Sequence, residues 1–192
     1  MAKEAFQQEE IQIVEALLFS SLEPLRQSKV DICFNGDAPK LQEVISLINK
    51  RYERNGNPFF VEKVARGYRL VTRPEFDPWI RRLHTRMGRT SLTRASLEVL
   101  SIIAYKGPVS RMEIESIRGV QSGSSVKTLL EKDLIKIKCR SDGPGRPLLY
   151  SVTDAFLVSF GLETLSDLPK IRDISELTSE HTPTDVFNNA TE

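Results

Sequence analysis

Apolar positions in the first half of the chain recur at helical spacing and then change to an alternating pattern. The helical spacing predicts helices over residues 9–21 and 39–55, with a shorter and less regular element over residues 25–34 between them. The alternating pattern predicts a hairpin whose strands cover residues 58–64 and 67–72. Three helices followed by a hairpin is the element order of a winged helix, a variant of the helix-turn-helix.

The second half of the chain repeats this order of elements. Apolar spacing predicts helices over residues 93–105, 110–119 and 122–133, followed by a hairpin formed by residues 134–137 and 148–152. We therefore expect an α+β fold that is mostly helical and contains two tandem winged-helix domains.

One more helix is expected between the two modules, over residues 74–86. Its apolar side chains have helical spacing, and we expect them to face inward: Phe76, Trp79, Ile80 and Leu83. Pro74 and Gly88 flank this helix, so we expect some freedom of the two modules relative to one another.

Charge is distributed unevenly and separates a tail from the body of the chain. The whole chain of 192 residues has a net charge of +1, but residues 171–192 hold one base and five acids. Apolar residues are sparse there, so we expect a flexible, disordered acidic tail. The predicted organisation is an N-terminal winged-helix domain with its linker helix over residues 1–88, a C-terminal winged-helix domain over residues 89–170, and this tail.

Bases gather in the middle of the chain, where residues 61–90 hold eight bases and three acids. Such a patch is either an electrostatic footprint for nucleic acid or an acidic protein, or a solvated helix face and loop. For DNA, the side chains expected to contact phosphates are Arg81, Arg82, Arg86 and Arg89. The third helix of each module offers few side chains suited to base edges, so we expect contact with DNA to be weak or indirect.

No arrangement typical of an enzyme, a cofactor site or a metal site is evident in the sequence. Histidine and cysteine are scarce and widely separated: His84, His181, Cys33 and Cys139. Ser124 and Lys127 match an SxxK spacing, but the motifs that accompany it in serine enzymes are missing. The Gly-rich loop of residues 143–147 lacks the GK[ST] ending of a phosphate-binding loop. We therefore expect no enzymatic activity and no cofactor.

The N-terminal residues and the apolar runs bear on where the protein is located. The N-terminus is polar and acidic, unlike a secretion signal, and charged or polar residues interrupt every long apolar run. We expect a cytoplasmic protein that does not cross a membrane.

Several short motifs, taken in order, resemble those of the segregation and condensation protein B family. They span residues 14–169 and read VEALLFS, EPL, GYRLVT, LSIIAYK, IESIRGV, LLEKDLI, GRPLLY, FGL and DLP. The resemblance implies a non-enzymatic adaptor that homodimerises, largely through its N-terminal domain, and binds the kleisin subunit of the bacterial SMC complex. In that family the ATPase belongs to the SMC partner, and the complex condenses and partitions chromosomes during cell division.

The resemblance also implies a nucleoid-associated location and a set of partner-facing side chains. On this interpretation the partner-binding residues are Tyr105, Arg118, Arg146 and Tyr150. Aromatic and arginine side chains beside a wing also tie hairpin to helix, and this alternative stays open. The alternative function is a winged-helix DNA-binding regulator or architectural protein.

Overall fold

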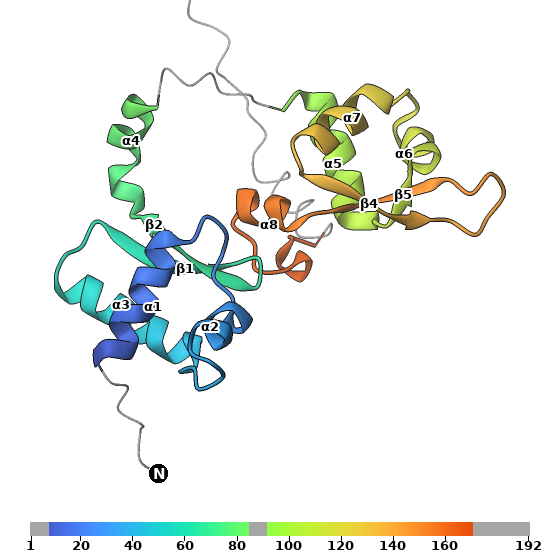
Figure 1. Ribbon diagram of the computed structural model, residues 1–192. Helices are drawn as coiled ribbons and strands as arrows, with labels where there is room; N and C mark the ends of the chain where they lie inside the picture. The colour runs from blue at the N-terminus through green and yellow to red at the C-terminus, as the bar shows by residue number, and fades with distance from the viewer. Residues whose placement is uncertain (1–7, 85–91, 171–192) are drawn as a thin grey trace, which may run out of the picture.

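The computed structural model describes residues 8–84 and 92–170 (Figure 1). In each of these ranges three α-helices and an antiparallel hairpin form a winged helix, and further short helical segments follow the hairpin, so the fold is α+β, mostly helical, with two tandem winged helices. The expected boundary at residue 88 and the acidic tail over residues 171–192 lie outside the described residues, and both stay predictions.

The first domain contains the elements that the apolar pattern predicts. Their bounds are α1 (Gln8–Ser20), α2 (Gln27–Cys33), α3 (Leu41–Arg54), β1 (Phe59–Val64) and β2 (Gly67–Thr72). All five apolar residues of the α3 stripe are buried: Leu41, Val44, Ile45, Ile48 and Tyr52. Burying a large aliphatic side chain of this kind contributes about 1.5–3 kcal/mol, so this stripe anchors the core.

A backbone bridge between Leu25 and Tyr68 ties the segment before α2 to strand β2. A side chain at Gly67 has no room, because a Cβ there would lie 2.8 Å from the Pro24 Cβ and 2.9 Å from the Pro24 backbone. Gly67 therefore permits the close approach that this bridge needs.

The second domain has the same order of elements, with one strand that the pattern does not reveal. It is formed by α5 (Arg94–Lys106), β3 (Val109–Ser110), α6 (Arg111–Arg118), α7 (Gly123–Glu131), β4 (Ile135–Arg140) and β5 (Leu148–Val152), and is followed by α8 (Asp154–Phe160) and η2 (Leu165–Asp167). The sheet order is β3-β5-β4, with both pairs antiparallel. A two-residue strand is too short to show alternation, so β3 leaves no signal in the sequence.

The linker segment forms η1 (Pro74–Phe76) and α4 (Asp77–Leu83), and the inward orientation expected for its apolar side chains is wrong. Neither element has a buried residue. Phe76, Trp79 and Leu83 are 37%, 63% and 79% exposed. Helical spacing shows that one face is apolar but does not say what covers it, and within the described residues nothing buries this face.

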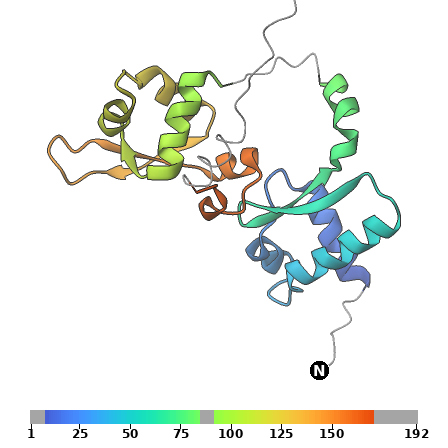
Figure 2. The ribbon, with the colours of Figure 1, turned by 180° about the vertical axis from the view of Figure 1, so that it is seen from behind.

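The hairpin of the first domain ends inside the second domain. Val64 and Ala65 are completely buried and belong to the hydrophobic core of the second domain. The Ala65 N–H donates to the Leu162 carbonyl over 2.9 Å, and Lys63 pairs with Glu163 at 2.6 Å. Figures 1 and 2 show the end of this hairpin beside α8 from opposite sides. These contacts oppose the interdomain freedom that Pro74 and Gly88 predict.

Candidate protein-interaction surfaces

Helix α4 carries an exposed apolar face that stands apart from both domain cores (Figure 1). Pro74 starts the preceding turn, and Asp77 in the first turn of α4 pairs with Arg81 one turn later. The rings of Phe76 and Trp79 lie 6.4 Å apart between centroids, and Leu83 follows Trp79 by four residues. The face therefore combines large apolar area with a basic edge, a composition typical of protein interfaces.

A groove of about 570 Å³ lies on the same domain between α1 and β2. Its lining is mainly apolar and includes Ala16, Phe19, Tyr52, Phe59, Leu70 and Val71. Phe19 is 82% exposed, whereas the rings of Tyr52 and Phe59 meet edge to face with 4.9 Å between centroids. The groove thus has a fixed aromatic wall and an open apolar rim.

A small polar network holds that wall in place. The Glu15 carboxylate accepts hydrogen bonds from the Tyr52 hydroxyl and from the Arg51 guanidinium. Burial, together with the Glu15 carboxylate, raises the pKa of Tyr52 well above its ordinary value of 10.0. Tyr52 therefore remains a protonated hydrogen-bond donor, and α1 is tied to α3 beside the groove.

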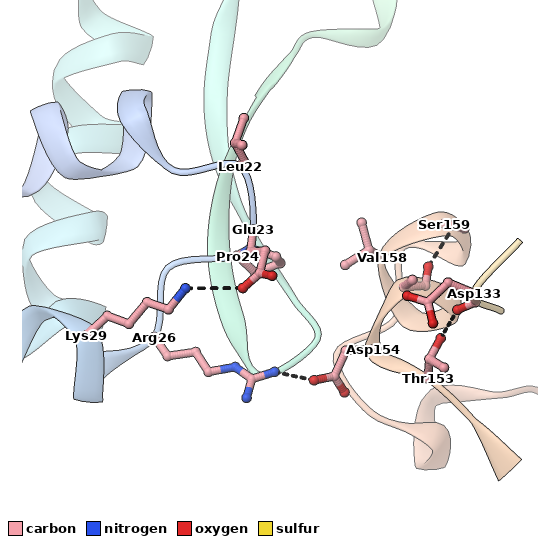
Figure 3. A pocket seen from close by; sticks show the side chains of 11 residues that line it. Leu22, Glu23, Pro24, Arg26, Lys29, Asp133, Thr153, Asp154, Val158 and Ser159 are labelled. Atoms are coloured by element: carbon pink, nitrogen blue, oxygen red, sulfur yellow. Dashed lines mark hydrogen bonds and ion pairs between the residues drawn. The ribbon is translucent and has the colours of Figure 1, made fainter. Parts of the chain in front are cut away.

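A cleft of about 530 Å³ lies between the two domains (Figure 3). At its edge the Arg26 guanidinium donates to the Asp154 carboxylate over 2.5 Å, and Lys29 pairs with Glu23 at 3.1 Å. The Arg26 guanidinium also donates to the Ala65 carbonyl over 3.4 Å. Arg26 thus links the hairpin tip to α8, and we interpret the cleft as part of the interface between the two domains.

Residues 12–171 match the protein family described as "Segregation and condensation complex subunit ScpB". The chain belongs to this family. Membership gives it a role in the SMC-associated complex that acts in chromosome condensation and partition.

Relatives named "Segregation and condensation protein B" cover most of the chain. The relative from Syntrophotalea carbinolica is 45% identical over 88% of this chain and 85% of its own length, and that from Clostridium tetani is 39% identical over 85% and 87%. Among solved structures, a conserved hypothetical protein from Chlorobium tepidum is 38% identical, with 81% of this chain and 97% of that chain covered and a TM-score of 0.40. ScpB from Mycobacterium tuberculosis is 27% identical, with 80% and 96% covered and a TM-score of 0.38.

The four predicted partner-binding residues have different environments in the second domain. Tyr150 is 8% exposed in the core, and the Arg118 side chain is 9% exposed, with its guanidinium donating to Glu98 over 2.9 Å and to the Ser122 hydroxyl over 2.8 Å. Tyr150 on β5 packs in the core, and Arg118 ties α6 to α5 and to the residue that precedes α7. Their role toward a partner stays a prediction.

The other two predicted residues are accessible. Tyr105 is 38% exposed and lines a groove of about 690 Å³ with Leu165 and Leu168, and its hydroxyl donates to the Pro169 carbonyl over 2.8 Å. Arg146 is exposed in the loop between β4 and β5. These positions suit contact with another molecule.

The side chains proposed for phosphate contact are only partly described. Arg81 and Arg82 lie exposed on α4, where Arg81 pairs with Asp77, while Arg86 and Arg89 lie outside the described residues. Lys127 pairs with Glu131 at 3.8 Å, as expected for a solvated lysine, and Cys33 and Cys139 are exposed free thiols.

Within residues 8–84 and 92–170, no group of three or more His, Cys, Asp or Glu side chains is placed to hold a metal ion. Over the same ranges, every helix is too short or too polar to span a bilayer.

The α4 face and the α1–β2 groove are the features that sequence reasoning missed. One sequence signal could have found the α4 face: the only tryptophan of the chain, Trp79, stands two residues before the Arg81-Arg82 pair. Tryptophan and arginine together are enriched at the centres of protein interfaces.

Proposed function

We propose that this chain is a non-enzymatic adaptor that homodimerises through its first domain and binds the kleisin subunit of the SMC complex, and through it the SMC ATPase. The observation that carries the proposal is membership of the ScpB family over residues 12–171. The exposed apolar surfaces support it, because an adaptor acts through surfaces that only a partner covers.

The dimer contact that the residues favour places the α4 helix of one copy in the α1–β2 groove of the other. Trp79 and Leu83 supply an apolar ridge, and the groove offers Phe19 at an apolar rim. The charges of the two surfaces are complementary, since the last turn of α4 carries Arg81 and Arg82 whereas the first turn of α1 carries two acids, Glu9 and Glu10. In a two-fold dimer each copy provides both a helix and a groove, so the contact forms twice.

The kleisin is proposed to bind the second domain, where apolar side chains stay exposed around the helices. These are Leu97 on α5, Met112 and Ile117 on α6, Val120 after α6, and Tyr105 at the end of α5. An amphipathic segment of the kleisin would use them as anchors within a polar rim. Separate surfaces for the two partners allow the dimer and the kleisin complex to exist together.

The double substitution Trp79→Glu with Leu83→Glu tests the dimer. It places two carboxylates on the proposed ridge, so we expect light scattering to report half the wild-type mass at micromolar concentration. The matched control, Leu22→Glu with Ile32→Glu, changes two other strongly exposed apolar side chains of the same domain and should leave the mass unchanged. A dimer that persists in the first variant, or a monomer in both, would overturn this interface.

A further inference from the structure

The two wings of this molecule are used differently. The tip of the β1–β2 hairpin is buried in the second domain, where Val64 and Ala65 have no exposed surface. The β4–β5 hairpin instead projects away from the helices, as both ribbon views show (Figures 1 and 2). One wing therefore joins the domains, and the other is presented to solvent.

Ion pairing differs between the helices and the projecting wing of the second domain. Four of the five bases on α5, α6 and α7 pair with carboxylates: Arg94, Arg111, Arg118 and Lys127. The bases of the projecting wing are Lys136, Lys138, Arg140 and Arg146, which we call the wing bases. All four are exposed, and none forms an ion pair with an acid in the part of the chain that the structure describes.

The strands of the first wing do not show this lack of ion pairs. Its two strand bases, Lys63 and Arg69, are both paired, with Glu163 and Glu62, each at 2.6 Å, whereas Arg66 at the turn is exposed and forms no ion pair among the described residues. Residues 134–147 of the second wing contain only one acid, Asp142, beside the four wing bases. Their charge is therefore uncompensated locally.

Three of the wing bases lie along the unpaired edge of the second sheet. Strand β4 lies at the edge of the sheet, and every residue after Ile135 in it is exposed. A β-bulge between Ile137 and Cys139 leaves Lys138 as the extra residue, and a bulge bends a strand and re-aims its side chains. Near the tip, the Arg140 guanidinium donates to the Arg146 carbonyl over 3.3 Å, which holds the loop together.

We infer that this second wing is a sequence-independent contact for the phosphate backbone of duplex DNA. Protein interfaces are depleted in lysine and rely on aromatic or aliphatic anchors, whereas the only large apolar side chain exposed on β4 is Ile137. DNA interfaces are far more positive, and lysine or arginine contacts to phosphate position a protein without reading bases. The site differs from the α4 arginines that the sequence favours for phosphate. It shares no residue with the kleisin contact proposed on α5 and α6, and the three bases changed in the test exclude Arg146, which the resemblance assigns to a partner.

The test compares two triple charge reversals in the full chain. Lys136→Glu, Lys138→Glu and Arg140→Glu change the wing, whereas Lys50→Glu, Arg54→Glu and Lys106→Glu change three exposed, unpaired bases elsewhere and alter the net charge equally. Fluorescence anisotropy with two short labelled duplexes of unrelated sequence measures affinity from low to moderate salt. Circular dichroism melting confirms that both variants are folded.

The wild type should bind both duplexes equally, with an affinity that falls steeply as salt rises. The wing variant should lose about tenfold or more in affinity. The slope of log affinity against log salt concentration should become about 2 to 3 less negative, because each phosphate contact contributes about −0.9 to it. The control variant should stay within about twofold of the wild type.

Three outcomes would overturn the proposal. The first is a wild type that does not bind DNA at low salt, and the second is an equal loss of DNA affinity in both variants. The third is polyglutamate binding to the wild type as tightly as DNA, which would make the wing a site for acidic protein. Kleisin binding by the wing variant is measured in parallel and should be unchanged, so that failure of the adaptor function and failure of the DNA contact are told apart.

Discussion

At the scale of single residues, capping side chains decide where α5 and α6 of the second domain begin. The Thr93 hydroxyl accepts from the Ser96 N–H at the start of α5. At α6, the Ser110 N–H donates to the Glu113 carboxylate over 2.7 Å while the Ser110 hydroxyl accepts from the Glu113 N–H over 3.3 Å. Both caps follow from the sequence, because the backbone groups they satisfy are orphaned in every helix.

The α6 cap gives stability a dependence on pH. Hydrogen bonds from Ser110 hold the pKa of Glu113 below its ordinary value of 4.5. The carboxylate therefore stabilises the fold fully above that value, and the contribution is lost as pH falls through the lower folded pKa. Glu113→Gln keeps a capping side chain without a charge, so the gap in thermal midpoint between wild type and variant should shrink in acid.

Thermal melts followed by circular dichroism from neutral to acidic pH check this prediction. Ser110→Ala removes the cap altogether and should cost about 1 kcal/mol at neutral pH. A gap between wild type and Glu113→Gln that stays constant at every pH would contradict the assigned role of the carboxylate.

At the scale of elements, the sequence predicts the helices and strands whose apolar residues recur periodically. It misses features that depend on contacts with other parts of the chain. The α3 stripe and both hairpins are confirmed, because burial against a core requires their spacing. Strand β3 is missed because its two residues are too few to alternate. The orientation of α4 is wrong because amphipathicity marks a face without naming the surface that covers it.

The interaction surfaces likewise depend on contacts between residues that are distant in the chain. The α1–β2 groove joins residues that are far apart in the chain, such as Phe19 and Leu70, so no local pattern reveals it. The wing bases are visible in the sequence, but only the structure shows that they lack acidic partners while four of the five bases on α5, α6 and α7 have them.

At the scale of the whole molecule, a strained turn is held where the two domains meet. Ala65 and Arg66 form the two-residue turn of the first hairpin with φ angles of 47° and 61°, a conformation that glycine and asparagine favour. Such strain costs on the order of 1 kcal/mol per residue and persists where surrounding contacts enforce it. The contacts are those of Ala65 with Leu162 and of Arg26 with Asp154. The contacts between the two domains thus stabilise the strained conformation of this turn.

Ala65→Glu should release the domains from one another, since a carboxylate has no room and no partner at this fully buried position. The chain supplies its own labelling sites, because its only two cysteines, Cys33 and Cys139, are exposed and lie in different domains. Energy transfer between fluorophores on them should be narrowly distributed in the wild type and broad in Ala65→Glu. Excess unlabelled protein prevents transfer between copies.

The neighbouring substitution Arg66→Glu is the matched control, because Arg66 is exposed at the same turn. It should retain the narrow wild-type distribution. Identical distributions in all three proteins would show that the hairpin tip does not hold the domains together.

The adaptor function is tested most directly by the mass of the complex that this chain forms with the kleisin from the same organism. Light scattering is measured on the purified chain, on the kleisin, and on their mixture at moderate salt. We predict a dimer of this chain alone and one stable, larger species in the mixture that still contains two copies of it. Two separate species at their individual masses in the mixture would contradict the proposed function.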